Sequence, residues 1–131
     1  MRKILIGIVV LSFIGCTQQE MTKEYWDNGN LKSEGFLNDT TKTGVWKLYN
    51  PQNELKQKGK YLNGEKEGLW FFYTSSNSEH KRRLWSHDFY KNGEEMYSVQ
   101  FGKDGKIKDF HIYDKDGFYL LSPNEDSYIE M

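Results

Sequence analysis

The chain has no alanine, one cysteine, two prolines and three histidines among its 131 residues. Because alanine is the best helix former, its absence argues against a helical fold. A single cysteine excludes an intrachain disulfide. The longest apolar run, Ile4–Ile14, is well short of the ~20 residues that a membrane-spanning helix needs. The chain is instead rich in aromatic residues and glycines, a composition that favours strands joined by tight turns.

The N-terminus has the layout of a secretory signal. Arg2 and Lys3 precede the apolar run, and the only cysteine, Cys16, follows it directly after a small residue. Residues 13–16 resemble the bacterial lipobox, in which the cysteine is acylated on sulfur and freed by cleavage on its N-terminal side. The alternative is a free thiol at the end of an ordinary signal peptide. The position of Cys16 favours lipidation, which also explains why the cysteine is single.

This interpretation divides the chain into a signal peptide at residues 1–15, a lipid-anchored tether at 16–23, one domain at 24–121 and a tail at 122–131. Two acyl chains or more anchor a protein almost permanently, so we expect an exported lipoprotein that works on a membrane surface of the cell envelope. In a Gram-negative cell the outer membrane is the favoured location. Cleavage removes two positive charges and changes the net charge from −1 to −3.

The charge pattern gives no case for nucleic acid, because no basic stripe stands out. The densest basic run is Lys81-Arg82-Arg83. A solvated strand or loop edge is the favoured interpretation of this run, ahead of a site for anionic lipid or another polyanion.

Turn dipeptides recur along the chain, and Asn-Gly or Asp-Gly between short apolar segments is the strongest local signal for a β-hairpin. They occur at Asn28-Gly29, Asn63-Gly64, Asn92-Gly93, Asp104-Gly105 and Asp116-Gly117. Apolar and polar residues alternate between them, so that Trp70 and Phe72 share one face of a strand while Phe71 and Tyr73 share the other. We predict an all-β fold, an antiparallel meander of about eight to ten strands.

An internal repeat underlies this pattern. The segment that begins at Tyr25 aligns without a gap to the segment that begins at Tyr49. The residues matched at this constant offset include Leu31 with Leu55, Gly35 with Gly59, Gly44 with Gly68, Trp46 with Trp70, and Tyr49 with Tyr73. The segment from Thr74 to Phe89 lacks the glycines and the pattern, so we interpret it as a degenerate unit.

The repeated residues resemble the bacterial variant of the MORN repeat. In the first unit they are Tyr25, Asn28, Gly29, Leu31, Lys32, Glu34, Gly35, Phe36, Gly44, Trp46 and Tyr49, and in the second Leu55, Gly59, Tyr61, Asn63, Gly64, Gly68, Trp70 and Tyr73. The resemblance implies stacked β-hairpins in an elongated, twisted sheet, with structural glycines at the turns. It also implies a scaffold or protein-binding role, and relatives are often labelled antitoxins. In an exported protein that label implies an immunity protein that blocks a toxin.

No catalytic constellation is visible in the sequence. The three histidines, His80, His87 and His111, match no standard metal spacing, and no hydrolase or metalloprotease motif occurs. We therefore expect a protein that is not an enzyme and that has no metal site and no cofactor.

Aromatic side chains are the best candidates for a binding surface, since tyrosine and tryptophan are common anchors of protein interfaces. Trp46 and Trp70 are expected to form the core, whereas Phe71, Tyr73, Trp26 and Trp85 are the candidate binding residues. We expect a protein partner; the alternative is a glycan- or lipid-binding component of the envelope. The exposed edges of such a sheet leave open whether two copies pair into a homodimer.

Overall fold

The computed structural model describes residues 21–76, 80–114 and 117–121. These residues form a single antiparallel sheet in which each strand pairs with the next along the chain, and they contain no helix. The strands are β1 (Met21–Tyr25), β2 (Leu31–Asn38), β3 (Thr41–Tyr49), β4 (Leu55–Leu62), β5 (Glu65–Tyr73), β6 (Leu84–Lys91), β7 (Glu94–Phe101), β8 (Ile107–Asp114) and β9 (Gly117–Leu121). The predicted all-β meander is confirmed.

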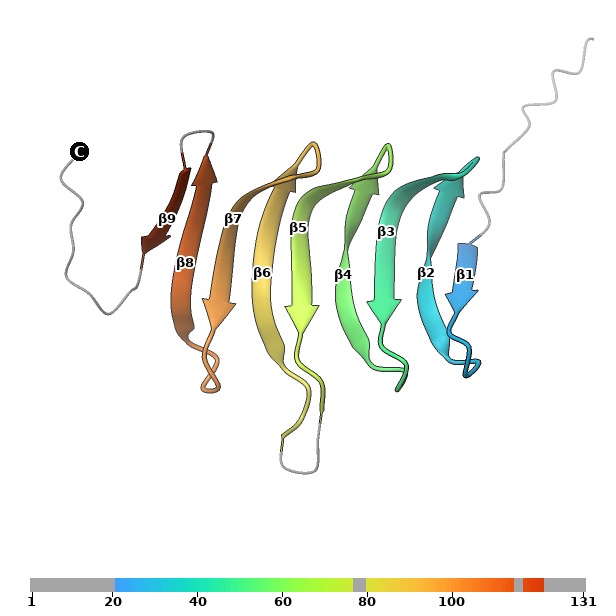
Figure 1. The fold of residues 1–131 in the computed structure, drawn as a ribbon, viewed down its shortest axis with the longest axis horizontal. Helices are drawn as coiled ribbons and strands as arrows, with labels where there is room; N and C mark the ends of the chain where they lie inside the picture. The colour runs from blue at the N-terminus through green and yellow to red at the C-terminus, as the bar shows by residue number, and fades with distance from the viewer. Residues whose placement is uncertain (1–20, 77–79, 115–116, 122–131) are drawn as a thin grey trace, which may run out of the picture.

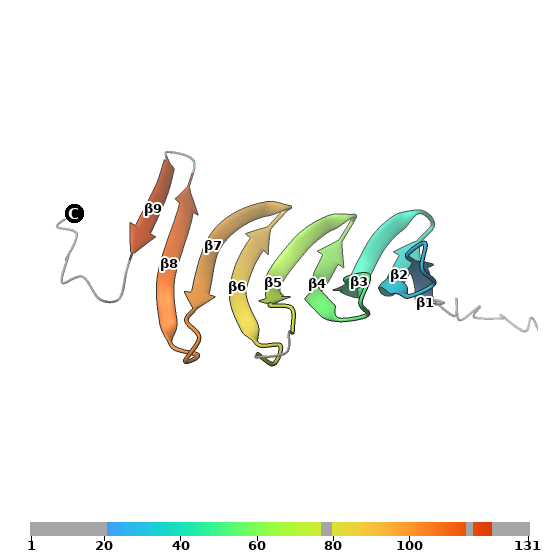
Figure 2. The ribbon, with the colours of Figure 1, turned by 60° about the horizontal axis from the view of Figure 1, so that its bottom comes forward.

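The sheet is elongated, with its strands lying across the long axis and the chain running from one end to the other (Figure 1). It is also strongly curved and twisted (Figure 2). The hairpin connections alternate between two edges: β1–β2, β3–β4, β5–β6 and β7–β8 turn at one edge, and β2–β3, β4–β5 and β6–β7 turn at the other. No second layer of the described residues covers either face.

Two of the three predicted Asn-Gly turns connect β4 to β5 and β6 to β7, and the third, Asn28-Gly29, lies in the longer β1–β2 connection. Asn63 and Gly64 have φ of 52° and 84°, the left-handed conformation that a two-residue hairpin of this type requires. Asn92 and Gly93 repeat it with 51° and 81°. The first of these turns is also hydrogen-bonded to the preceding hairpin, because the Gly64 amide donates to the Lys42 carbonyl at 3.0 Å. The turns therefore couple neighbouring repeats as well as reversing the chain.

The core consists of tryptophan rings that lie flat on glycines. Trp46 and Trp70 are both 0% exposed, although the sheet has only one layer. A Cβ atom on Gly35 would lie 2.3 Å from the Trp46 ring, and one on Gly59 would lie 2.3 Å from the Trp70 ring. Only glycine lets each ring reach the backbone of the neighbouring strand. This contact explains why glycine and tryptophan recur together in the two repeats.

Hydrogen bonds hold the indole of Trp46, and edge-on aromatic contacts connect it to Trp70. The Trp46 Nε1 donates to the carbonyls of Phe36 and Thr43, both at 3.1 Å. The Tyr61 ring lies between the two tryptophans, with its centroid 6.2 Å from Trp46 and 4.9 Å from Trp70, and both contacts are T-shaped. The repeats are thus joined by a continuous row of rings.

The third unit keeps the strand pairing of the other units, although its sequence from Thr74 to Phe89 lacks their glycines and pattern. β6 pairs with β5 along its whole length, and the Asn92-Gly93 turn takes the place that Asn63-Gly64 has in the preceding unit. The residues that lengthen this unit belong to the β5–β6 connection, which joins Thr74 to Arg83 where the other connections at that edge are shorter. An insertion in a loop hid the repeat from a search at constant offset.

The boundaries of the domain are also corrected. β1 begins at Met21, within the predicted tether of residues 16–23, and pairs with β2 through Met21 and Phe36. At the other end, β9 extends to Leu121, the last residue that the structure describes. The signal peptide, Cys16, Asp116 and the tail at 122–131 lie outside the described residues. None of the described residues belongs to a helix long and apolar enough to cross a membrane.

Candidate functional site

The sheet has two chemically different faces. The face that carries Trp46 and Trp70 is here called the tryptophan face. The opposite face carries Lys58, Phe71 and Tyr73 and is called the cation–aromatic face. Lys58 pairs directly with Phe71 across β4 and β5, and its ammonium lies 5.3 Å from the Phe71 ring and 6.0 Å from the Tyr73 ring. The predicted alternation, which set Phe71 and Tyr73 opposite Trp70, is confirmed.

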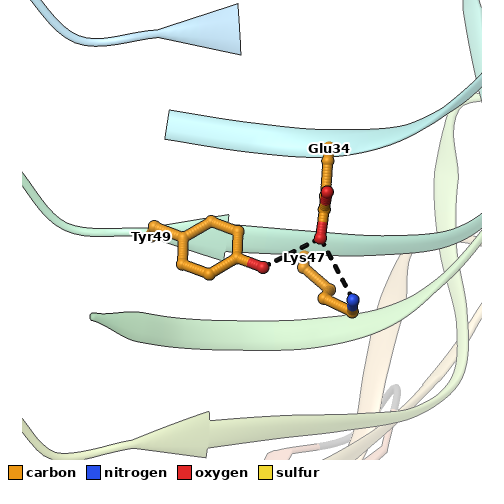
Figure 3. Close-up of polar contacts among 3 residues, drawn as sticks. All are labelled: Glu34, Lys47 and Tyr49. Atoms are coloured by element: carbon orange, nitrogen blue, oxygen red, sulfur yellow. Dashed lines mark hydrogen bonds and ion pairs between the residues drawn. The ribbon is translucent and has the colours of Figure 1, made fainter. Parts of the chain in front are cut away.

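In the first repeat the cation–aromatic face has a closed polar network (Figure 3). Glu34 Oε1 accepts a hydrogen bond from Lys47 Nζ at 3.0 Å and another from the Tyr49 hydroxyl at 2.9 Å. The hydrogen bond from Lys47, followed by that from Tyr49, lowers the pKa of the Glu34 carboxyl. Burial, together with the Glu34 charge, raises the pKa of Tyr49 to about 12. The carboxylate thus has its partners within the chain.

In the second repeat the same three positions carry different chemistry. In the alignment that matches Trp46 with Trp70, Lys58 replaces Glu34, Phe71 replaces Lys47, and Tyr73 matches Tyr49. The Arg82 guanidinium, from the β5–β6 connection, lies 5.2 Å from the centre of the Tyr73 ring. Cations held over aromatic faces at such distances are attracted by the ring quadrupole. At the described positions, the second repeat therefore has two cations and no carboxylate where the first has a balanced set.

Trp85 lies beside this group. It is the unpaired bulge residue where β6 begins, and the equivalent bulges at the start of β2, β4 and β8 fall at Lys32, Lys56 and Lys108. Trp85 remains 43% exposed. Because lysine occupies the equivalent position three times, the fold does not require an aromatic ring there. The Trp85 ring is therefore left exposed on the surface without being needed for the strand pairing.

A surface hollow joins Trp85 to Tyr73. Its volume is about 390 Å³, and its lining residues are Lys56, Gln57, Phe72, Tyr73, Thr74 and Trp85. This size falls in the lower part of the range of small-ligand clefts, which is about 300–1,000 Å³. Of the four predicted binding residues, the structure brings Tyr73 and Trp85 together at the hollow and sets Phe71 next to them.

Trp26, the fourth predicted binding residue, lies elsewhere. It belongs to the β1–β2 turn, and its Nε1 donates to the Tyr49 carbonyl at 3.1 Å. The Lys32 ammonium lies 5.0 Å from its ring. Trp26 thus fastens the first hairpin to the second, and its role in binding stays a prediction.

The histidines do not converge on one site. His87 lies between Phe71 and Phe101, with ring centroids 6.4 and 5.3 Å away, on the cation–aromatic face. The neighbouring Asp88 pairs with Trp70 on the other face, so these two residues do not share a metal site with His80. No group of three potential metal ligands occurs among the residues that the structure describes.

A cluster of titratable groups on the tryptophan face was missed by the sequence interpretation. In the third repeat Asp88 takes the place of Gly59 and Ser98 lies across from it, where the earlier repeats have tryptophan. The Ser98 hydroxyl donates to Asp88 Oδ1 at 2.6 Å, and both side chains are buried. Nearby, the Tyr90 hydroxyl donates to Glu95 Oε2 at 3.2 Å. An alignment that allows for the longer β5–β6 connection would have revealed the substitution.

Burial controls the electrostatics of this cluster. Desolvation, assisted by the Asp88 charge, raises the pKa of the Glu95 carboxyl, and desolvation lowers the pKa of the Lys66 ammonium. Clustered shifts of this kind can mark an active site. Here the two central members, Asp88 and Ser98, are buried and hydrogen-bonded to each other. The cluster is best explained as the polar replacement of a Trp–Gly contact.

Replacement of Glu95 by Gln is expected to increase stability at neutral pH. A carboxyl whose folded pKa is raised supports folding below its ordinary pKa, near 4.5, and loses that contribution as pH rises through the raised value. Glutamine cannot ionise and can still accept the Tyr90 hydrogen bond. Urea unfolding at several pH values should therefore show the Glu95→Gln gain growing from pH 4.5 toward neutrality. The exposed neighbour Glu94→Gln is the control, and a gain independent of pH would contradict the explanation.

Comparisons with known proteins do not identify a family. No protein-family model matches the chain, and no curated protein matches it. One solved structure that is similar is described as "Crystal structure of GtfA/B complex bound to UDP and GlcNAc". That match has 11% sequence identity and a TM-score of 0.31, and it covers 81% of this chain. The chain spans only 24% of the length of that protein, and a similarity this weak carries no functional argument.

Proposed function

We propose that this chain is a lipid-anchored envelope protein, attached through Cys16, which binds another protein on its cation–aromatic face and catalyses no reaction. The observation that carries the proposal is the group formed by Lys58, Phe71, Tyr73, Arg82 and Trp85. Aromatic and arginine side chains dominate the binding energy of protein interfaces.

The architecture supports a binding role. An elongated repeat sheet presents an extended surface, and proteins of this design bind partners along such surfaces. Beyond Tyr73 the cation–aromatic face continues as ring contacts, in which Phe89 stacks on Tyr97 at 5.3 Å and Tyr97 lies 5.9 Å from Phe110. These rings form the apolar part of the surface.

A non-enzymatic role is supported by the way in which the reactive groups are used. Glu34 accepts two hydrogen bonds on one oxygen, and Asp88 is paired with Ser98. The three histidines belong to different places on the sheet. A blocking role of the immunity type is one form that such binding takes, since it needs surface complementarity and no chemistry.

The direct test is an affinity pull-down from native envelopes after crosslinking, read by mass spectrometry. The wild-type chain is expected to enrich one or a few proteins, and Phe71→Ser/Tyr73→Ser is expected to lose them, because these changes remove two central rings. Leu62→Ser is the matched control: Leu62 is 45% exposed and lies at the far end of β4, beside the other edge. It should retain the partner.

The alternative is a glycan- or lipid-binding role, and the hollow beside Trp85 favours the glycan form, since an aromatic ring at a shallow hollow suits a sugar. The same pull-down distinguishes the two. If polysaccharide or lipid is recovered and no protein exceeds an unrelated lipoprotein control, the protein-binding proposal is wrong.

A further inference from the structure

On the cation–aromatic face, equivalent positions of the first and second repeats can be compared directly. Tyr49 and Tyr73 occupy equivalent positions, each at the end of its strand and each followed by a hairpin connection. In the first repeat the tyrosine hydroxyl and a lysine ammonium share one carboxylate oxygen, which belongs to Glu34 (Figure 3). The chain thus shows what a tyrosine in this position binds when a carboxylate is available.

The second repeat retains the tyrosine donor, lacks the carboxylate acceptor, and has cations from other positions. Its equivalent of Glu34 is Lys58, and the chain adds Arg82, whose side chain approaches the same tyrosine ring from the β5–β6 connection. Within residues 21–76, 80–114 and 117–121, neither Lys58 nor Arg82 forms an ion pair with a carboxylate, and the Tyr73 hydroxyl has no hydrogen bond. Two cations therefore lie over the ring of Tyr73, whose equivalent in the preceding repeat donates to a carboxylate.

Aromatic rings hold the two cations in place. Lys58 lies over two rings at 5.3 and 6.0 Å, and Arg82 lies over Tyr73 at 5.2 Å. Ring contacts fix the position of each cation without neutralising its charge. Cations fixed in this way beside a hydroxyl donor favour an anion with more than one acceptor oxygen, because little side-chain freedom is then lost on binding.

We infer that Lys58, Tyr73 and Arg82 form a docking site for a side-chain carboxylate, aspartate or glutamate, in an acidic segment of a protein partner. This inference rests on the proposed function and names the chemistry of the partner. The partner's carboxylate accepts a hydrogen bond from Tyr73, as Glu34 accepts one from Tyr49 in the first repeat. Tyr73 also lines the hollow at the end of its strand, and this hollow, beside Trp85 and Thr74, accepts a neighbouring apolar side chain of the same segment.

The test uses the full chain in non-ionic detergent and fluorescein-labelled hexaglutamate, with hexaglutamine as the neutral comparison and fluorescence anisotropy as the readout. Because the chain carries a net charge of −1, general attraction to a polyanion is not expected. Hexaglutamate should bind at physiological ionic strength, and hexaglutamine at least about tenfold more weakly. Equal binding of the two peptides would overturn the inference.

Lys58→Glu is the decisive variant. It recreates the carboxylate of the first repeat. Tyr73 should then donate its hydrogen bond to the new glutamate, which leaves no place for a carboxylate from a partner. Since Glu34 is accommodated at the equivalent position, folding should be preserved, and circular dichroism checks this. The affinity for hexaglutamate should fall at least about tenfold. Tyr73→Phe, which removes a single hydroxyl, should lower it about threefold.

Lys60→Glu is the matched control. Lys60 is exposed two residues further along β4, faces Val45 and Glu67, and its replacement changes the charge by the same amount. Its affinity should remain within about threefold of wild type, because exposed charges away from the contact are largely screened. An equal loss in Lys58→Glu and Lys60→Glu would show a diffuse charge effect and overturn the site.

The remaining outcomes separate this inference from the function on which it rests. Binding of glycerol phosphate through Lys58 without binding of hexaglutamate would assign the site to a phosphate headgroup and overturn the inference. If the pull-down with Phe71→Ser/Tyr73→Ser supports a protein partner but Lys58→Glu retains that partner, the proposed function stands and the carboxylate site is wrong. If hexaglutamate does not bind and the pull-down also shows no protein partner that depends on Phe71 and Tyr73, the protein-binding face itself is rejected.

Discussion

Gly59→Ala is expected to destabilise the fold by about 1–3 kcal/mol or more, the range for overpacking a core, even though it adds one methyl group. The added Cβ would lie 2.3 to 2.5 Å from three atoms of the Trp70 indole, far inside van der Waals contact. The ring has no room to withdraw: it is 0% exposed, and its Nε1 donates to the Lys60 carbonyl at 3.1 Å. The measurement is urea unfolding followed by circular dichroism.

Gly102→Ala is the matched control. Gly102 also has an ordinary φ, and an added Cβ would meet the end of the flexible Asp104 side chain at 2.8 Å, so a small rotation relieves the contact. We expect a change within about 0.5 kcal/mol, as for most surface substitutions. If Gly59→Ala cost no more than this control, the flat packing of tryptophan on glycine would not be the reason for the repeated glycine.

The strand architecture could be predicted because its causes are local. Asn63-Gly64 and Asn92-Gly93 adopt the left-handed conformations that their residue types favour, and alternation along β5 sets the facing of Trp70 and Phe71. The repeat supplied the order of the strands, since identical neighbouring hairpins pair in sequence. Turn chemistry and period are therefore sufficient to specify a meander.

The third repeat could not be read in the same way, because its pattern is interrupted by the longer β5–β6 connection and its core pair is replaced. Asp88 and Ser98 bear no resemblance to glycine and tryptophan, yet their hydrogen bond occupies the same position between strands. Such a substitution depends on two distant residues changing together. Sequence periodicity, which treats positions singly, does not detect it.

The binding surface was predictable only in part. The position of Phe71 and Tyr73 on the cation–aromatic face follows from the alternation along the strand, so these two residues could be predicted. The part played by Lys58 and Arg82 depends on which ring each cation covers, and Arg82 reaches Tyr73 from a connection that the repeat does not contain. The structural contact of Trp26 could not be predicted, because its hydrogen bond to the carbonyl of Tyr49, in the next hairpin, has no signature in the sequence.

Trp70→Ala should have the larger effect on the whole molecule, a loss of about 3–5 kcal/mol, as for other fully buried tryptophans. The side chain lies on Gly59, touches Tyr61 edge-on at 4.9 Å and Tyr90 at 6.5 Å, and has the Lys66 ammonium 4.5 Å from its ring. Its removal opens a cavity and breaks the row of rings between the second and third repeats. Tryptophan fluorescence and circular dichroism measure the loss.

The Trp70→Ala substitution should also split the unfolding of the sheet into separate transitions. Substantial contacts join only consecutive strands, so the stability of each repeat depends on its neighbours, as in other repeat arrays. Loss of the central ring is therefore expected to separate the unfolding of the N-terminal repeats from that of the C-terminal ones, giving transitions at different urea concentrations where the wild type has one. Trp85→Ala, which removes the same side chain from a 43% exposed position, should leave a single transition close to wild type.

The number of transitions decides what carries the cooperativity of the sheet. A single, uniformly shifted transition for Trp70→Ala would show that the sheet unfolds as one unit, held together by the hydrogen-bonded strand ladder and not by the row of rings. Gly59→Ala in the Trp70→Ala background then measures the coupling between the two residues. The penalty of the added methyl should nearly vanish once the ring is gone, because the two residues contact each other directly and their effects are coupled.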